Sequence, residues 1–154
     1  MIRPAQRSDC AAVWGLIVRL AEYERLDHLL AGSPEALEKA LFDDRCCEAL
    51  VAEEDGAIVG YALFYPTFST FLARPGLWLE DLFVVPERRG AGIGKALLSE
   101  VVRIAKARGA GRLEWSVLDW NEPAIRFYES LGARLVPDWR FCRLDAEGLD
   151  RFVC

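Results

Sequence analysis

The fold is decided by the stretch Trp78-Leu79-Glu80-Asp81-Leu82-Phe83-Val84-Val85-Pro86-Glu87-Arg88-Arg89-Gly90-Ala91-Gly92-Ile93-Gly94-Lys95. Its first eight residues are rich in aromatic and branched apolar side chains, which is typical of a buried strand. Pro86 cannot donate a ladder hydrogen bond and therefore ends that strand. A helix is predicted next, because apolar residues recur at helical spacing from Ile93 to Ala105 with polar residues opposite.

The turn between this strand and this helix has the composition of a phosphate-binding site. It contains three glycines: Gly90, Gly92 and Gly94. Their missing Cβ atoms let the backbone amides of residues 90–95 face one bound group. The start of a helix adds bare amides and the positive end of the helix dipole. Basic side chains complete the set: Arg88, Arg89 and Lys95.

Two well-known phosphate loops do not fit this turn. A P-loop requires Gly-x-x-x-x-Gly-Lys-Ser/Thr, but Ala96 follows Lys95 and Arg89 stands at the first glycine position. A dinucleotide fingerprint requires Gly-x-Gly-x-x-Gly, and here the third glycine, Gly94, comes one residue early. The pattern that fits is Arg-x-x-Gly-x-Gly over residues 89–94. It resembles the acetyl-CoA pyrophosphate loop of the GNAT family of N-acetyltransferases.

A second stretch runs Val117-Leu118-Asp119-Trp120-Asn121-Glu122-Pro123-Ala124-Ile125-Arg126-Phe127-Tyr128-Glu129-Ser130-Leu131-Gly132-Ala133. Its strand, asparagine break, helix and closing glycine resemble the second conserved region of GNAT enzymes. Residues 79–84 and 21–24 narrow the resemblance to the diamine (spermidine/spermine) and thialysine N-acetyltransferase subgroup. Residues 117–121 favour the thialysine branch.

The resemblance implies an α/β (α+β) fold with a mixed, mostly antiparallel sheet flanked by helices and splayed at the central strand to admit acetyl-CoA. Residues 1–154 are expected to form one N-acetyltransferase domain. Outside the two motifs we expect strands over residues 2–4, 47–52, 57–65, 113–118 and 139–144, and helices from about 9 to 25, from 33 and from 121 to 131. Asp55-Gly56 predicts a tight hairpin. Residues 67–76 are expected to be an irregular loop and residues 145–154 a poorly specified tail.

Acetyl-CoA is the co-substrate that this family uses, and no metal is expected. The resemblance assigns its contacts to Phe83, Val84, Val85, Arg88, Arg89, Gly90, Ala91, Gly92, Ile93, Gly94, Lys95, Asn121 and Tyr128. The backbone of Phe83 and Val85 would pair with the pantetheine arm. Asn121 would hydrogen-bond the same arm, although as a helix cap it needs no such role.

Acetyl transfer to an amine requires a neutral nitrogen, whereas a free alkylamine with a pKa of roughly 10 is protonated near pH 7. Glu80 could remove that proton, directly or through water, and hold the cation beforehand. Glu80 and Asp81 should point to opposite faces of the strand, so only one can face the acetyl carbonyl. The family pattern favours Glu80, while a salt bridge at a strand edge is the structural alternative. Tyr128 occupies the position where the family places the acid that protonates the leaving thiolate.

The formal net charge of −5 argues against general nucleic-acid binding and is compatible with a small cationic substrate. Residues that could line a cationic groove are Glu24, Asp27, Glu80, Asp81, Asp138 and Trp139, and of these Glu24 and Trp139 match substrate-contact positions of the resembled subgroup. Two other functions stay open. One is acetylation of a protein N-terminus, a lysine or another amine, and the other is a non-catalytic acyl-CoA sensor, which would need neither Glu80 nor Tyr128.

The composition is that of a globular protein, with 53% hydrophobic and 28% charged residues in a chain of 154. Charged residues interrupt every apolar run before the roughly 18 residues that a bilayer span requires, and no signal peptide is expected. Five cysteines without metal-type pairs suggest free thiols in a reducing cytoplasm. The subgroup resemblance implies a homodimer, with neither nucleic acid nor a membrane as partner.

Overall fold

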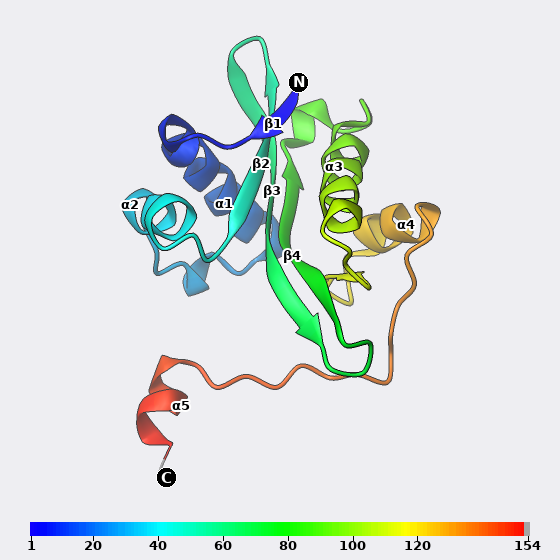
Figure 1. Cartoon of the computed structure of the whole chain (residues 1–154). Coiled ribbons are helices and arrows are strands. Elements are labelled where there is room, and N and C mark those ends of the chain that lie inside the picture. The colour runs from blue at the N-terminus through cyan, green and yellow to red at the C-terminus, as the bar shows by residue number, and fades with distance from the viewer. Residues whose placement is uncertain (153–154) are drawn as a thin grey trace. The chain divides into compact units, whose positions relative to one another are not determined.

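The computed structural model describes residues 1–152 and is organised around a five-stranded sheet (Figure 1). The strands follow chain order across it: β1 (Ile2–Pro4), β2 (Glu48–Glu54), β3 (Ala57–Ser69), β4 (Arg74–Val84) and β5 (Leu113–Glu114). β1 to β4 pair antiparallel, and β5 runs parallel to β4. The expected mixed, mostly antiparallel sheet is confirmed. The chain forms two compact units, Met1–Ser116 and Val117–Cys154, and each is described by itself.

Helices cover both faces of the sheet within the first unit (Figure 1). On one face lie α1 (Cys10–Glu24) and α2 (Pro34–Glu38), which continues as a π-helical turn over Lys39–Asp43; on the other lies α3 (Ile93–Ala107). Short 3-10 turns span Arg7–Asp9, Asp27–Leu29 and Pro86–Arg88. The second unit contains α4 (Glu122–Ser130) and α5 (Ala146–Arg151).

Side-chain alternation along β3 assigns its residues to the two faces. A Cβ on Gly60 would lie 3.4 Å from Leu97 Cδ1 of α3, so Gly60 and Phe64 face α3. Tyr61 and Tyr65 face the opposite side, which α1 covers. Both layers are closely packed, since Tyr61, Phe64 and Leu97 are fully buried. Burial of an apolar side chain of this size contributes on the order of 1.5–3 kcal/mol.

The hairpin prediction at Asp55-Gly56 is confirmed, because both residues have positive φ (50° and 78°), as a primed turn requires. The expected loop over residues 67–76 is wrong, because β3 continues to Ser69 and β4 begins at Arg74. Pro66 is accommodated because the β2–β3 ladder ends at Phe64, so β3 has a neighbour on one side only at this point.

The C-terminal expectations also need correction. Of the expected strand over residues 113–118, only Leu113 and Glu114 form a ladder, and they pair with Leu77 and Trp78 of β4. The ladder thus ends two residues before a bulge at Glu80. Residues 139–144 form no strand, since no partner among residues 1–152 pairs with them. The expected tail from residue 145 contains α5, which Asp145 caps by accepting the Gly148 N–H at 2.8 Å. Residues 153 and 154 lie outside the described residues.

Candidate active site on strand β4

A β-bulge in β4 determines how the acidic side chains of this strand point. Asp81 pairs with Leu63 and Leu79 pairs with Phe64, so Glu80 is an extra residue in the β3–β4 ladder. An extra residue of this kind interrupts the alternation of side chains between the two faces of a strand.

The contacts of the two carboxylates show the result. The Tyr65 hydroxyl donates to Glu80 Oε2 at 3.1 Å, and the Tyr61 hydroxyl donates to Asp81 Oδ2 at 3.0 Å. Tyr61 and Tyr65 are four residues apart on β3 and point to the same face. Glu80 and Asp81 therefore lie on one face, the face that α1 covers. The expectation that they point to opposite faces is wrong, because it assumed an unbroken strand.

Glu24, in the last turn of α1, is the third member of what we call the acidic cluster: Glu24, Glu80 and Asp81. Burial, together with the charges of Glu80 and Glu24, raises the pKa of Asp81 to about 6, although the hydrogen bond from Tyr61 acts in the opposite direction. Burial also raises the pKa of the Glu24 carboxyl. The cluster therefore concentrates negative charge at a half-buried place, which is the electrostatic environment that a cationic ligand requires. Asp27, in the turn after α1, is exposed.

The glycine-rich turn between β4 and α3 presents bare backbone. Gly90 and Gly92 have φ of 84° and 80°, a region that favours glycine, and a Cβ on either residue would meet nothing within 4 Å. Gly92 is the N-cap of α3, so the amides of Ile93, Gly94 and Lys95 belong to the first turn, whose N–H groups have no partner within a helix. Open space in front of these amides fits a pyrophosphate group.

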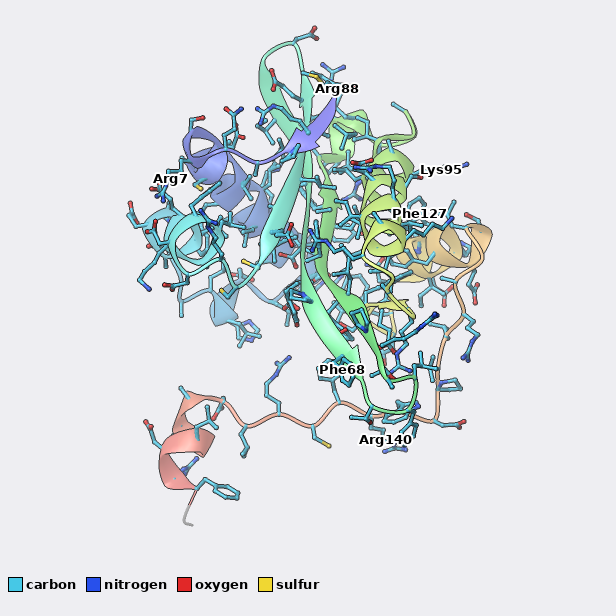
Figure 2. The ribbon with its side chains drawn as sticks, in the orientation of Figure 1. Arg7, Phe68, Arg88, Lys95, Phe127 and Arg140 are labelled. Carbon is cyan, nitrogen blue, oxygen red and sulfur yellow. The ribbon has the colours of Figure 1, made fainter. Side chains whose placement is uncertain are left out.

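The three basic residues of the turn have different roles. Arg89 donates from Nε to the Val84 carbonyl at 3.0 Å, and its guanidinium lies over the rings of Tyr23 (4.7 Å) and Phe83 (5.5 Å). Arg88 approaches Glu54 at 3.6 Å. Lys95 is exposed in the first turn of α3. Figure 2 labels Arg88 and Lys95, both in the upper part of the first unit. The arginine of the Arg-x-x-Gly-x-Gly pattern thus has intramolecular contacts that the sequence did not predict.

Strand β4 offers a free edge beyond Trp78, since within residues 1–152 its ladder with β5 ends there. The Val85 N–H donates to the Val59 carbonyl at 2.9 Å, so this amide is not available to a pantetheine arm, contrary to expectation. Backbone N–H and C=O groups alternate in direction along an antiparallel strand, so those of Phe83 point to β3, as the N–H of Val85 does. Those of Leu82 and Val84 point to the free edge of β4. Leu82 was missed because the register of β4 with β3 cannot be read from this sequence.

The remaining candidate residues lie in the second unit. Asn121 caps α4, where its side-chain oxygen accepts the Ala124 N–H at 3.4 Å. Tyr128 is half-buried on the same helix, with its ring 5.3 Å from that of Phe127. Asp138 and Trp139 are exposed and lie outside the helices and strands.

The order of elements and the glycine turn define the class of protein. The sequence profile described as "Acetyltransferase (GNAT) family" matches residues 6–133, so the chain belongs to this family and is an N-acetyltransferase. The predicted family is confirmed, and so is the resemblance to the thialysine subgroup. Members of the GNAT family use acetyl-CoA as co-substrate.

Curated relatives span nearly the whole chain. A thialysine N-epsilon-acetyltransferase of Bos taurus is 36% identical over 97% of this chain and 94% of the relative. The L-ornithine N5-acetyltransferase of Arabidopsis thaliana is 30% identical over 96% of this chain and 85% of the relative. Among solved structures, an integron cassette protein from the V. cholerae mobile metagenome shares the fold with a TM-score of 0.81, at 26% identity over 98% of this chain and 95% of that one.

Within residues 1–152, no group of three or more His, Cys, Asp or Glu side chains could hold a metal ion. Over the same residues, no helix has both the length and the apolar character needed to cross a membrane.

The raised pKa of Asp81 makes a prediction about stability. The folded protein holds this proton more tightly (about 6) than the unfolded chain (3.8), so the ionised carboxyl opposes folding above about pH 6, and the effect fades as the pH falls toward 4. Asn would keep an acceptor for Tyr61 without the charge. Asp81→Asn should therefore raise the free energy of unfolding by on the order of 1–2 kcal/mol near pH 7.5, after allowance for solvent screening, with little gain near pH 4.

Urea unfolding at the two pH values measures this difference. Asp150→Asn, a change of the same kind at an exposed position on α5, is the control and should alter stability little at either pH. Equal stability of the Asp81→Asn variant and the parent near pH 7.5 would contradict the prediction.

Proposed function

We propose that this protein is an acetyl-CoA-dependent N-acetyltransferase that moves an acetyl group directly to a primary amine of a small cationic acceptor, such as a polyamine, thialysine or a lysine-like amino acid. The observation that carries the proposal is the acidic cluster beside the free edge of β4. The cluster can attract an ammonium group, and the edge continues into the glycine turn that suits a pyrophosphate. The similarity to a thialysine N-epsilon-acetyltransferase and an L-ornithine N5-acetyltransferase supports an amino acid with a side-chain amine as the acceptor.

The acetyl carrier would be held by backbone rather than by side-chain charge. Leu82 and Val84 turn their amide groups to the free edge of β4, where an extended arm can pair with them. Val84 and the segment 88–95 remain the proposed contacts in the first unit, whereas the backbones of Phe83 and Val85 face β3. Lys95 is the basic residue in the first turn of α3. In the second unit we propose Asn121 and Tyr128, which come from the family pattern.

The chemistry requires one proton to leave the amine and one to reach the leaving sulfur. Glu80 is proposed to take the ammonium proton, directly or through water, so that the neutral nitrogen can attack the thioester carbonyl. As the carbon–sulfur bond breaks, the thiolate of a thiol with a pKa of roughly 8.5 leaves, and Tyr128 is proposed to protonate it. Glu24 and Asp81 would hold the acceptor, together with the exposed Asp27, Asp138 and Trp139.

Further proposals concern organisation. Residues 1–154 are proposed to act as one N-acetyltransferase domain, because the family profile crosses the boundary between the two units. A homodimer in the cytoplasm is proposed from the subgroup, and the free thiols of the described cysteines support a reducing compartment. Exposed aromatic residues on the β3–β4 hairpin, Phe68 and Phe71, offer apolar surface to such a dimer.

Replacement of Gly92 tests the cofactor turn. Gly92→Leu should abolish binding of acetyl-CoA, because the added side chain would occupy the space in front of the α3 amides. Gly109→Leu is the matched control, since Gly109 also has a positive φ (68°) and open space but follows the other end of α3. Calorimetry should find a loss of at least about 100-fold in affinity for Gly92→Leu alone. Similar affinities in the two variants would remove the assignment of the turn.

Tyr128→Phe tests the general acid. The change keeps the ring and removes only the hydroxyl, so kcat should fall roughly 10²- to 10⁴-fold while the affinity for acetyl-CoA changes little. Stopped-time thiol assays and calorimetry on the same preparation separate the two effects. Near-normal turnover would leave Tyr128 with a structural role on α4.

A panel of acceptors tests the function itself. The panel contains spermidine, thialysine, L-ornithine and lysine, together with an amine that carries no other charged group and a peptide N-terminus. The readout is thiol release. We expect a cationic acceptor to have the highest kcat/KM, and its KM should rise with ionic strength, since about 10 Å is the screening length at 0.1 M salt. Glu80→Gln should lower kcat and weaken this salt dependence, while Glu100→Gln, an equal charge change on α3, should not. A peptide as best substrate with a salt-independent KM would favour the protein-acetylating alternative.

A further inference from the structure

Two neutral donors converge on a single oxygen of Glu80. The Tyr65 hydroxyl donates to Oε2 at 3.1 Å from β3, and the Trp78 indole N–H donates to the same oxygen at 2.9 Å from β4. Tyr65 and Trp78 are paired opposite each other in the β3–β4 ladder. Glu80 lies two residues after Trp78, so alternation along β4 places it on the face that this pair occupies, and the bulge adds Asp81 to the same face. Side chains from two strands therefore meet at one atom.

Glu80 is exposed, so water could solvate its carboxylate without help from the protein. Two hydrogen bonds restrict the rotamers of this side chain, which costs conformational entropy. Since water could already satisfy the carboxylate, the two donors are better explained by a role in orienting it. Both donors are uncharged, so they fix the carboxylate without cancelling its charge. A Lys or Arg in their place would hold the proton acceptor as an ion pair.

The donors keep their protons over the working range of an amine acetyltransferase. Burial, together with the charge of Glu80 and the hydrogen bond to it, raises the pKa of Tyr65 to about 12. An indole N–H can only donate. The charged groups in the cluster with Glu80 are Asp81 on the same strand and Glu24 on α1. The Tyr61 hydroxyl on β3 also faces the cluster and donates to Asp81.

We propose that Tyr65 and Trp78 are positioning residues that clamp Oε2 of Glu80 and thereby aim the other oxygen, Oε1, at the proton of the acceptor amine. The proposal rests on the role of Glu80 as the base in the proposed function. Among residues 1–152 both hydrogen bonds go to Oε2, which leaves Oε1 to receive the proton, directly or through water. Neither Tyr65 nor Trp78 touches the reacting atoms.

The test is a double-mutant cycle with Glu80. Tyr65→Phe and Trp78→Phe each remove one donor and keep an aromatic ring, and both are made in the parent and in the Glu80→Gln background. In the parent we expect kcat for the best acceptor of the panel to fall roughly 3- to 10-fold per variant, with KM changed less than about 2-fold. The acid limb of the pH–rate profile should move to higher pH, because the charged carboxylate loses a donor. In the Glu80→Gln background neither variant should lower kcat further.

Trp14→Phe, a change of the same kind on α1, is the control and should leave the pH–rate profile unchanged. Thermal unfolding shows whether each variant is folded, and Tyr65→Phe alone can decide the matter if Trp78→Phe is not. Equal losses in the parent and in the Glu80→Gln background, or an unchanged kcat and pH profile, would overturn the clamp. If Glu80→Gln itself turns over like the parent, the base assignment fails first, and that outcome is distinguishable from the others.

Discussion

One extra residue in β4 is the constraint on which the site depends. In a regular strand, Asp81 on the α1 face would send Glu80 to the opposite face, where α3 packs the buried Leu97 against the sheet. An ionised carboxylate there would cost several kcal/mol. The bulge returns Glu80 to the polar side and lets Leu79, only 2% exposed, enter the core instead. The same local irregularity thus completes the core and assembles the acidic cluster.

Arg89 connects this cluster to the glycine turn. Its guanidinium lies over Tyr23, which is the neighbour of Glu24 at the end of α1, while its Nε–H holds the Val84 carbonyl. Cation–aromatic contacts at exposed positions such as Arg89 and Tyr23 contribute on the order of 0.5–1 kcal/mol. One side chain therefore contacts the last turn of α1 and the end of β4 from the start of the turn before α3. The proposed acceptor site and the proposed carrier site are thus connected through Arg89.

The sequence predicted those features that local patterns determine and missed those that depend on register. The helix after Gly92, the turn at Asp55-Gly56 and the cap at Asn121 have residue-level signals, and the structure contains all three. Nothing at Glu80 announces a bulge, because neither glycine nor proline is present, and the extra residue exists only relative to β3. Tyr65 was not recognised as a partner of Glu80, because its position opposite Trp78 depends on the register of β3 with β4.

Other misses have the same origin. The strand of residues 57–65 was expected to end before Pro66, although proline is tolerated where a strand has one neighbour. The motif indicated a phosphate ligand at Arg89, but the direction of that side chain is set by Tyr23, which is distant in sequence. Residues 139–144 were expected to form a strand, yet a strand needs a ladder partner, and none pairs with them within the described chain.

The acidic cluster also has consequences for turnover under the proposed function. The pKa of Asp81 is raised first by burial and further by the charges of Glu80 and Glu24, and an arriving ammonium group relieves the repulsion between these charges. Tight binding of the cation alone would stabilise the ground state as much as the transition state and gain nothing in kcat. Transfer of the proton to Glu80 avoids this difficulty, because the amine becomes neutral while its positive charge stays inside the cluster. Once the amide has formed and Glu80 has returned its proton to solvent, the cluster faces an uncharged group, and the renewed repulsion favours release of the product.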